Sequence, residues 1–202
     1  MRIGIFGGTF NPPHTGHLLL AQAAMEGAKL DRIIFMPCAT PPHKTETHIP
    51  DGKHRYRMVE LATEDDSRFE LSDMEINAGG KSYTALTLKH LEELYPEDRL
   101  CFIVGADSLC DMEKWYHPEE VFGRAEIVVA YRGGEDTVKM DEAAEYFEEK
   151  YGAEITRVSM PVIEMSSSDI RQRISEGRSV RYMVCDKVID YINKTGIYKE
   201  NI

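Results

Sequence analysis

Two histidines three residues apart, His14 and His17, follow a glycine pair near the start of the chain. Residues 7–17 read Gly-Gly-Thr-Phe-Asn-Pro-Pro-His-Thr-Gly-His and separate a short apolar run from an alanine- and leucine-rich stretch. Glycines allow close backbone approach to a ligand, and a helix N-terminus offers unpaired N–H groups and a positive dipole end. We therefore predict a phosphate-binding site here. The residues expected to form it are Gly7, Gly8, Thr9, Phe10, His14 and His17.

A second group of candidate residues lies far along the chain, within Met-Ser-Ser-Ser-Asp-Ile-Arg at positions 165–171. Serine hydroxyls at the start of a helix and an arginine one turn later supply donors that suit a polyphosphate. Taken by itself, the stretch is equally typical of an ordinary serine cap followed by a surface arginine. The candidates are Ser166, Ser167, Ser168 and Arg171.

The apolar pattern predicts the elements that position these residues. A first strand ends at the glycines and a helix begins at His17. Further strands are expected at 31–38, 68–72, 99–104, 125–130 and 154–158, and helices at 53–64, 83–95, 141–150, 166–174 and around 184–192. Strands that alternate with helices predict an α/β fold with a doubly wound parallel sheet, a helical C-terminus and a single domain over 1–202.

In a doubly wound sheet, ligands lie beyond the carboxyl ends of the strands, where the strand order reverses. Three segments that follow predicted strands contain polar or glycine residues: 7–17, 41–44 and 105–108. We expect these three segments, each read as a loop, to line one crevice.

The composition argues against several classes of binding partner and of structural site for this protein. The 202 residues carry a formal net charge of −11, which disfavours non-specific binding to nucleic acid or to an anionic membrane surface. The four cysteines are scattered without a C-x-x-C pair, so a zinc cluster or a disulfide framework is not expected. No signal peptide precedes the first strand and no apolar run reaches membrane-spanning length, so we predict a soluble cytoplasmic protein.

The two motifs together resemble those of the nucleotidylyltransferase superfamily, H-x-G-H near the start and [ST]-x-x-R near the end. Neither the G-x-G-x-x-G fingerprint nor a P-loop is present. With the chain length, the sequence looks like the bacterial nicotinate mononucleotide adenylyltransferase family nearly end to end, which implies a Rossmann-like fold. Further stretches that match in order and spacing are 41–44, 82–84, 105–108 and 114–116.

The resemblance implies roles for several residues. Trp115 would stack on a pyridine ring, with backbone N–H groups near Thr84 and Tyr116 on the nicotinate carboxylate. Lys44 would contact the mononucleotide phosphate. Asp107, which we count among the ATP-binding residues, would contact ribose hydroxyls. Each has a simpler alternative: core packing for the tryptophan, a solvated side chain for the lysine and a turn-stabilising role for the aspartate. Two positions depart from the family pattern, with Leu86 in place of an aspartate and Ser168 in place of a threonine.

The implied reaction transfers AMP from ATP to nicotinate mononucleotide, giving deamido-NAD and pyrophosphate by direct in-line attack. His14 and His17 would contact the bridging phosphates, Arg171 and the serine segment would hold pyrophosphate, and Mg²⁺ would accompany ATP. The protein itself is expected to hold no metal ion.

Other functions stay open on the sequence. Within the superfamily these are transfer to nicotinamide mononucleotide or pantetheine phosphate, and cytidylyl transfer. Outside it they are a non-catalytic nucleotide sensor and a zinc module built from His14, His17 and His43. The oligomeric state is also open.

Overall fold

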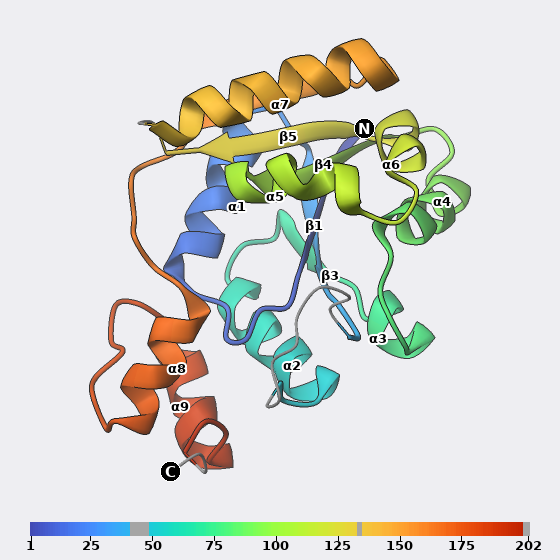
Figure 1. Cartoon of the computed structure of the whole chain (residues 1–202). Helices are drawn as coiled ribbons and strands as arrows, with labels where there is room; N and C mark the ends of the chain where they lie inside the picture. Colours follow the sequence, from blue (N-terminus) through green and yellow to red (C-terminus); the bar gives the residue numbers. More distant parts are fainter. Residues whose placement is uncertain (41–48, 133–134, 200–202) are drawn as a thin grey trace.

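The strand β1 (Arg2–Gly8) lies inside a parallel sheet, and it and its two neighbours are buried along continuous runs of residues, as in sheets covered on both faces. The computed structural model describes residues 1–40, 49–132 and 135–199, and within these ranges the sheet has six strands in the order β3-β2-β1-β4-β5-β6 (Figure 1). The other strands are β2 (Arg32–Pro37), β3 (Phe69–Leu71), β4 (Arg99–Gly105), β5 (Glu126–Tyr131) and β6 (Ile155–Ser159). The predicted doubly wound parallel sheet is confirmed.

Helices cover both faces of this sheet. On one face, α4 (Thr84–Leu94), α5 (Ala106–Asp111), α6 (Pro118–Arg124) and α7 (Glu135–Tyr151) share a buried cluster with Ile3 and Ile5. On the other face, α1 (Thr15–Gly27) and α2 (Gly52–Thr63) share a cluster with Phe6. Successive side chains of a strand point to opposite faces, so one strand feeds both clusters.

The helices α8 (Ser167–Ser175) and α9 (Asp186–Thr195) form a third buried cluster with α2 (Figure 1). Its members include Met58 from α2, Ile170 from α8, and Val188 and Ile192 from α9. The predicted helical C-terminus is thus confirmed, and it packs beside the sheet through α2. No helix in the described ranges combines the length and the apolar character needed to cross a membrane.

The start of α1 differs from the prediction. The helix begins at Thr15, and His14, with extended backbone angles of φ −143° and ψ 168°, is its N-cap. Because the expected start was His17, the sequence pattern placed the helix two residues late. The polar residues His14 and Thr15 obscure the boundary, since only the later residues show an apolar face.

Further segments were not foreseen as helices, among them α6 (Pro118–Arg124). The stretch 105–108, expected as a loop, is the start of α5: Gly105 is the N-cap and Asp107 lies in the first turn, where a carboxylate complements the helix dipole. The short helix α3 (Met74–Ala78) was not predicted, because five residues give no readable period. The expected loop at 41–44 lies outside the described residues.

The contact between α1 and β6 can be tested at Gly27. A Cβ atom added there would lie 2.9 Å from Cβ of Val158 and even closer to one of its methyl groups. We expect Gly27→Ala to lower the free energy of unfolding by about 1–3 kcal/mol, because a rigid β-branched side chain must shift. Urea unfolding measures this change.

Gly123→Ala is the matched control. Gly123 lies inside α6 and an added Cβ would meet no atom within 4 Å. Its stability should stay equal or rise by up to about 1 kcal/mol, as alanine restricts the unfolded chain. Equal effects of the two substitutions would show that α1 does not pack tightly on β6.

Candidate active site

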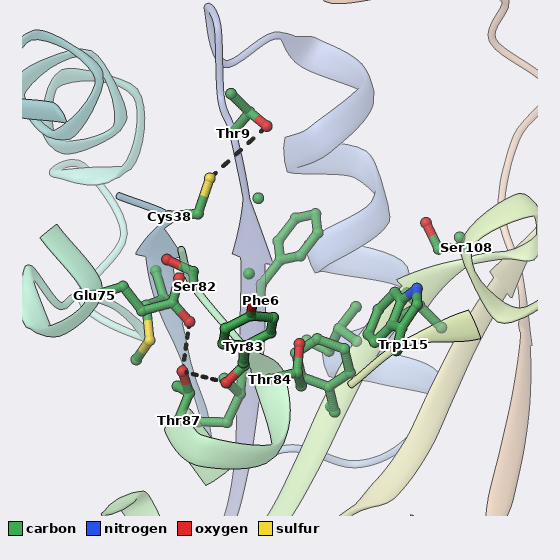
Figure 2. Close-up of a pocket in the computed structure, with 18 of the residues that line it drawn as sticks. Phe6, Thr9, Cys38, Glu75, Ser82, Tyr83, Thr84, Thr87, Ser108 and Trp115 are labelled. Atoms are coloured by element: carbon green, nitrogen blue, oxygen red, sulfur yellow. Dashed lines mark hydrogen bonds between the residues drawn. The ribbon is translucent and has the colours of Figure 1, made fainter. Parts of the chain in front are cut away.

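A cavity of about 270 Å³ opens where β1 and β4 end, next to each other in the sheet. The strand order reverses between these two neighbours, so the cavity occupies the place where doubly wound sheets bind ligands. Its described walls include Gly7, Gly8 and Thr9 from the end of β1 and Thr84 from the start of α4. Figure 2 shows Trp115 and Glu75 on opposite sides of this space.

Six of the predicted site residues line this cavity: Gly7, Gly8, Thr9, Thr84, Trp115 and Tyr116. Asp107 does not line it; the carboxylate lies on the exposed first turn of α5, while Ser108 one residue later does contribute to the wall. Lys44 lies outside the described residues. The cavity therefore gathers residues from four segments that are separate in the sequence: 7–9, 84, 108 and 115–116.

One wall of the cavity is aromatic. The indole of Trp115 packs edge-on against Phe102 of β4, with ring centroids 6.0 Å apart and planes at 83°. The rings of Tyr83 and Tyr116 lie 4.6 Å apart on the same wall. Trp115 thus combines the packing role with a place on the cavity surface, and an aromatic wall of this kind suits a flat ring.

The two histidines of the H-x-G-H motif lie against each other at the start of α1. The backbone N–H of His14 donates to Nδ1 of His17 at 3.2 Å, and the ring centroids are 3.8 Å apart. Because Nδ1 of His17 accepts this hydrogen bond, a neutral His17 carries its proton on Nε2. Gly16 leaves the space for this arrangement, as an added Cβ would lie 3.0 Å from Nδ1 of His14.

Burial controls the charge of His14. The side chain is 8% exposed, and its Nδ1 atom has no hydrogen-bond partner in the described part of the protein. Burial, with a smaller contribution from the positive charge of Arg132, lowers the pKa of His14 to about 4. His14 is therefore neutral at pH 7 in this ligand-free structure.

Phe10 takes a supporting position. Its side chain is 2% exposed and packs edge-on against Phe6 and His17, with centroids 5.4 and 5.1 Å away. It has a φ of 48°, in the left-handed region. The ring therefore supports His17 by packing against it, and Phe10 is not among the residues that line the cavity.

The two motifs meet although they are more than 150 residues apart. Nη1 of Arg171 donates to the carbonyl oxygen of Asn11 at 2.8 Å, and Oγ of Ser167 donates to that of Pro12 at 2.9 Å. Both carbonyls belong to the segment that links Gly8 to His14. The start of α8 is thus fastened to the segment that carries the histidines.

The remaining serines of the second motif also have defined roles. Oγ of Ser166 accepts the N–H of Asp169 as the N-cap of α8, and Oγ of Ser168 accepts from Nη2 of Arg171 at 3.2 Å. Ser166 is therefore the ordinary cap that the sequence allowed. Arg171 is half-buried and tied to the protein, so it is not a freely solvated surface arginine.

Sequence reasoning missed Arg55, which is 1% exposed and lies in the first turn of α2. Its guanidinium donates to the carbonyl oxygens of Thr9 at 3.0 Å, Ala39 at 2.8 Å and Pro50 at 3.1 Å. No carboxylate of the described residues pairs with it. The sequence did contain one indication that Arg55 is buried: it lies three residues before the buried Met58, on the same face of the helix.

The described residues contain no group of three or more histidine, cysteine or acidic side chains that could hold a metal ion. The zinc hypothesis also required His43, which lies outside the described residues.

The lowered pKa of His14 gives a pH dependence. The unfolded chain binds this proton below about pH 6.5 and the folded protein only near pH 4, so stability is lost as the pH falls through this window. We expect the wild type to lose up to about 3 kcal/mol more than His14→Gln between pH 7 and pH 4. Urea unfolding of both proteins at a series of pH values measures this difference. If the two free energies of unfolding change with pH in parallel, the lowered pKa of His14 is contradicted.

Comparisons with known proteins agree with this geometry. The cytidylyltransferase-like family model matches residues 5–173. Relatives named as probable nicotinate-nucleotide adenylyltransferases include those of Lachnoclostridium phytofermentans, 43% identical, and Caldicellulosiruptor bescii, 40% identical. Each alignment covers 98% of this chain, and 98% and 100% of the respective relative.

Solved structures show the same fold. Two structures of the nicotinic acid mononucleotide adenylyltransferase of Plasmodium falciparum, one complexed with APC and one with NaAD, superpose with TM-scores of 0.78 and 0.79. They are 22% and 21% identical and cover 99% of this chain and 98% of theirs. By family model and by full-length sequence identity, the chain belongs to the cytidylyltransferase-like family and, within it, to the nicotinate-nucleotide adenylyltransferases.

Proposed function

We propose that this protein transfers AMP from ATP to nicotinate mononucleotide, giving deamido-NAD and pyrophosphate as a step of NAD biosynthesis. The observation that carries the proposal is the contact of Arg171 and Ser167 with the carbonyls of residues 11 and 12. It brings the two phosphate-binding motifs together beside a cavity with an aromatic wall. A mononucleotide in the cavity and ATP between the motifs would be adjacent.

The cavity contains an aromatic face that suits the nicotinate ring and an N–H donor that suits its carboxylate. Trp115 offers a flat face for an electron-poor ring. Thr84 is the first residue of α4, so its N–H has no acceptor within the helix and is available to a carboxylate. With Tyr116 on the same wall, these residues form the proposed acceptor subsite, and Lys44 stays a candidate for the phosphate of the acceptor. Asp107 stays a candidate for the ribose hydroxyls of ATP.

The chemistry requires no protein base. The phosphate of the mononucleotide is already an anion at neutral pH and would attack the α-phosphorus of ATP in line, with pyrophosphate leaving. Catalysis then rests on positioning and on hydrogen bonds to the phosphoryl oxygens. His14, neutral in the ligand-free protein, and His17, with its proton on Nε2, are the proposed donors.

The N-terminus of α8 is the proposed holder of the leaving pyrophosphate. Its first backbone N–H groups and Arg171 combine a helix dipole with a fixed cation. The glycines Gly7 and Gly8 and the backbone of Thr9 and Phe10 complete the proposed ATP site. Mg²⁺ enters with ATP as part of the substrate, since Mg²⁺ in such sites is commonly bound through substrate phosphates.

The proposal is tested by pyrophosphate release from ATP with nicotinate and nicotinamide mononucleotides assayed side by side. We expect a kcat/KM at least about tenfold higher for the nicotinate form, because paired N–H donors favour a carboxylate over an amide. Equal values would contradict the acceptor assignment, and no release with either acceptor would contradict the function itself.

His17 is tested by substitution. We expect His17→Ala to lower kcat by roughly 10²-fold or more, as when one preorganised donor to a developing charge is removed. The control is His90→Ala, which removes an exposed imidazole of α4 that does not line the cavity. Steady-state kinetics at saturating ATP measure both variants, and a near wild-type kcat for His17→Ala would refute the role.

A further inference from the structure

Glu75 lies in the wall of the proposed acceptor cavity, on the short helix α3 that the sequence pattern did not reveal. Among the described residues that line the cavity, it is the one with a charged side chain. Figure 2 shows it across the cavity from Trp115, beside Ser82 and Thr87. The proposed acceptor is an anion, so the presence of a negatively charged side chain in its cavity needs a physical explanation.

The carboxylate is held in place by one oxygen and leaves the other available. Oγ1 of Thr87 donates to Oε1 of Glu75 at 2.6 Å, which is a short, charge-assisted hydrogen bond. The same hydroxyl lies 3.3 Å from the carbonyl of Tyr83, but it has one proton and the shorter bond to the carboxylate takes it. Within the described part of the chain, Oε2 has no hydrogen-bond partner.

The charge of the acceptor restricts which of its groups can face Glu75. Nicotinate mononucleotide, the acceptor of the proposed function, is anionic at its ring carboxylate and at its 5′-phosphate. Either group would be repelled by a carboxylate at close range. The pyridinium nitrogen is cationic but carries no N–H, so it can attract the carboxylate without donating a hydrogen bond to it. The ribose hydroxyls, which lie between the two anionic groups, are the donors that a carboxylate accepts from.

From this we infer that Glu75 is a specificity-determining residue, whose free carboxylate oxygen accepts a hydrogen bond from the ribose 2′- or 3′-hydroxyl of the acceptor mononucleotide. The inference rests on the proposed function, since it takes the acceptor to be a ribonucleotide anionic at both ends. The carboxylate of Glu75 would then recognise the ribose from the side of the cavity opposite the aromatic wall.

Two other roles for Glu75 make different predictions. If the Thr87 contact only fastens α3 to α4, removing the carboxylate charge affects stability without changing the preference among acceptors. If Glu75 instead faces the ring substituent, it favours an amide and disfavours a carboxylate. Its removal then changes the ratio between nicotinate and nicotinamide acceptors and leaves sugar discrimination intact.

The test measures kcat/KM for nicotinate mononucleotide and for its 2′-deoxy and 3′-deoxy analogues, in the wild type and in Glu75→Gln. We expect the wild type to prefer the ribonucleotide over one deoxy analogue by roughly 10- to 100-fold, the range for a hydrogen bond to a charged group. In Glu75→Gln this preference should shrink to a few-fold, mostly through KM. Nicotinamide mononucleotide is assayed in parallel.

The control is Glu93→Gln, which removes the same charge from an exposed position of α4 that does not line the cavity. It should retain the full sugar preference. Glu75→Asp is the second variant: it keeps the charge on a shorter arm, and we expect it to lose most of the preference. If Glu75→Gln does not fold, this variant carries the test.

The outcomes separate the two proposals. Equal ribose-to-deoxyribose ratios in wild type and both Glu75 variants would overturn the role of Glu75 while leaving the transferase function standing. A changed nicotinate-to-nicotinamide ratio with an intact sugar preference would also overturn it. A wild type inactive with every acceptor would overturn the proposed function and, with it, this inference.

Discussion

The buried guanidinium of Arg55 is the constraint on which the site depends. A cation taken out of water must be compensated by acceptors in good geometry, and here three backbone carbonyls provide them. They belong to the loop after β1, to the loop after β2 and to Pro50, the residue before the N-cap Asp51 of α2. Because the guanidinium is planar and its donors are fixed, these three segments cannot move independently without leaving a buried donor unpaired.

The second constraint joins the ends of the chain. Arg171 and Ser167 bind the carbonyls of residues 11 and 12, and the hydroxyl of Tyr198 donates to Oδ1 of Asn11 at 2.6 Å. A further contact between this part of the chain and the C-terminal region is the hydrogen bond from the N–H of Thr15 to the carbonyl oxygen of Met183. The segment between Gly8 and α1 is therefore held from one side by α2 and from the other by the C-terminal helices. A loop that would otherwise fluctuate becomes a rigid part of the site.

Much of this could be predicted from the sequence, because the signals are local. Glycines, a helix start and two histidines identified the first motif, and buried runs such as Ile33–Met36 identified the strands. The alternation of strands and helices then fixed the sheet. Trp115 and Thr84 were named from a family resemblance and not from periodicity, and the cavity contains both.

What could not be predicted depends on contacts distant in sequence. Arg55 looks like a solvated residue of an amphipathic helix until its carbonyl partners from two loops are known. Glu75 lies on a helix too short to show a period, and its place in the cavity follows from the packing of α3 beside β2. The charge state of His14 depends on burial, which a motif does not report.

The contacts of the histidine segment with α8, Met183 and Tyr198 have a consequence for synthesis. A ribosome makes β1 and both histidines well before the residues that hold them. A nascent chain that has emerged only as far as β6 (Ile155–Ser159) can form all the strands of the described sheet, yet it lacks every one of these partners. The central sheet can thus assemble early, while the segment that carries both histidines reaches its described geometry only when α8, α9 and the residues around them dock.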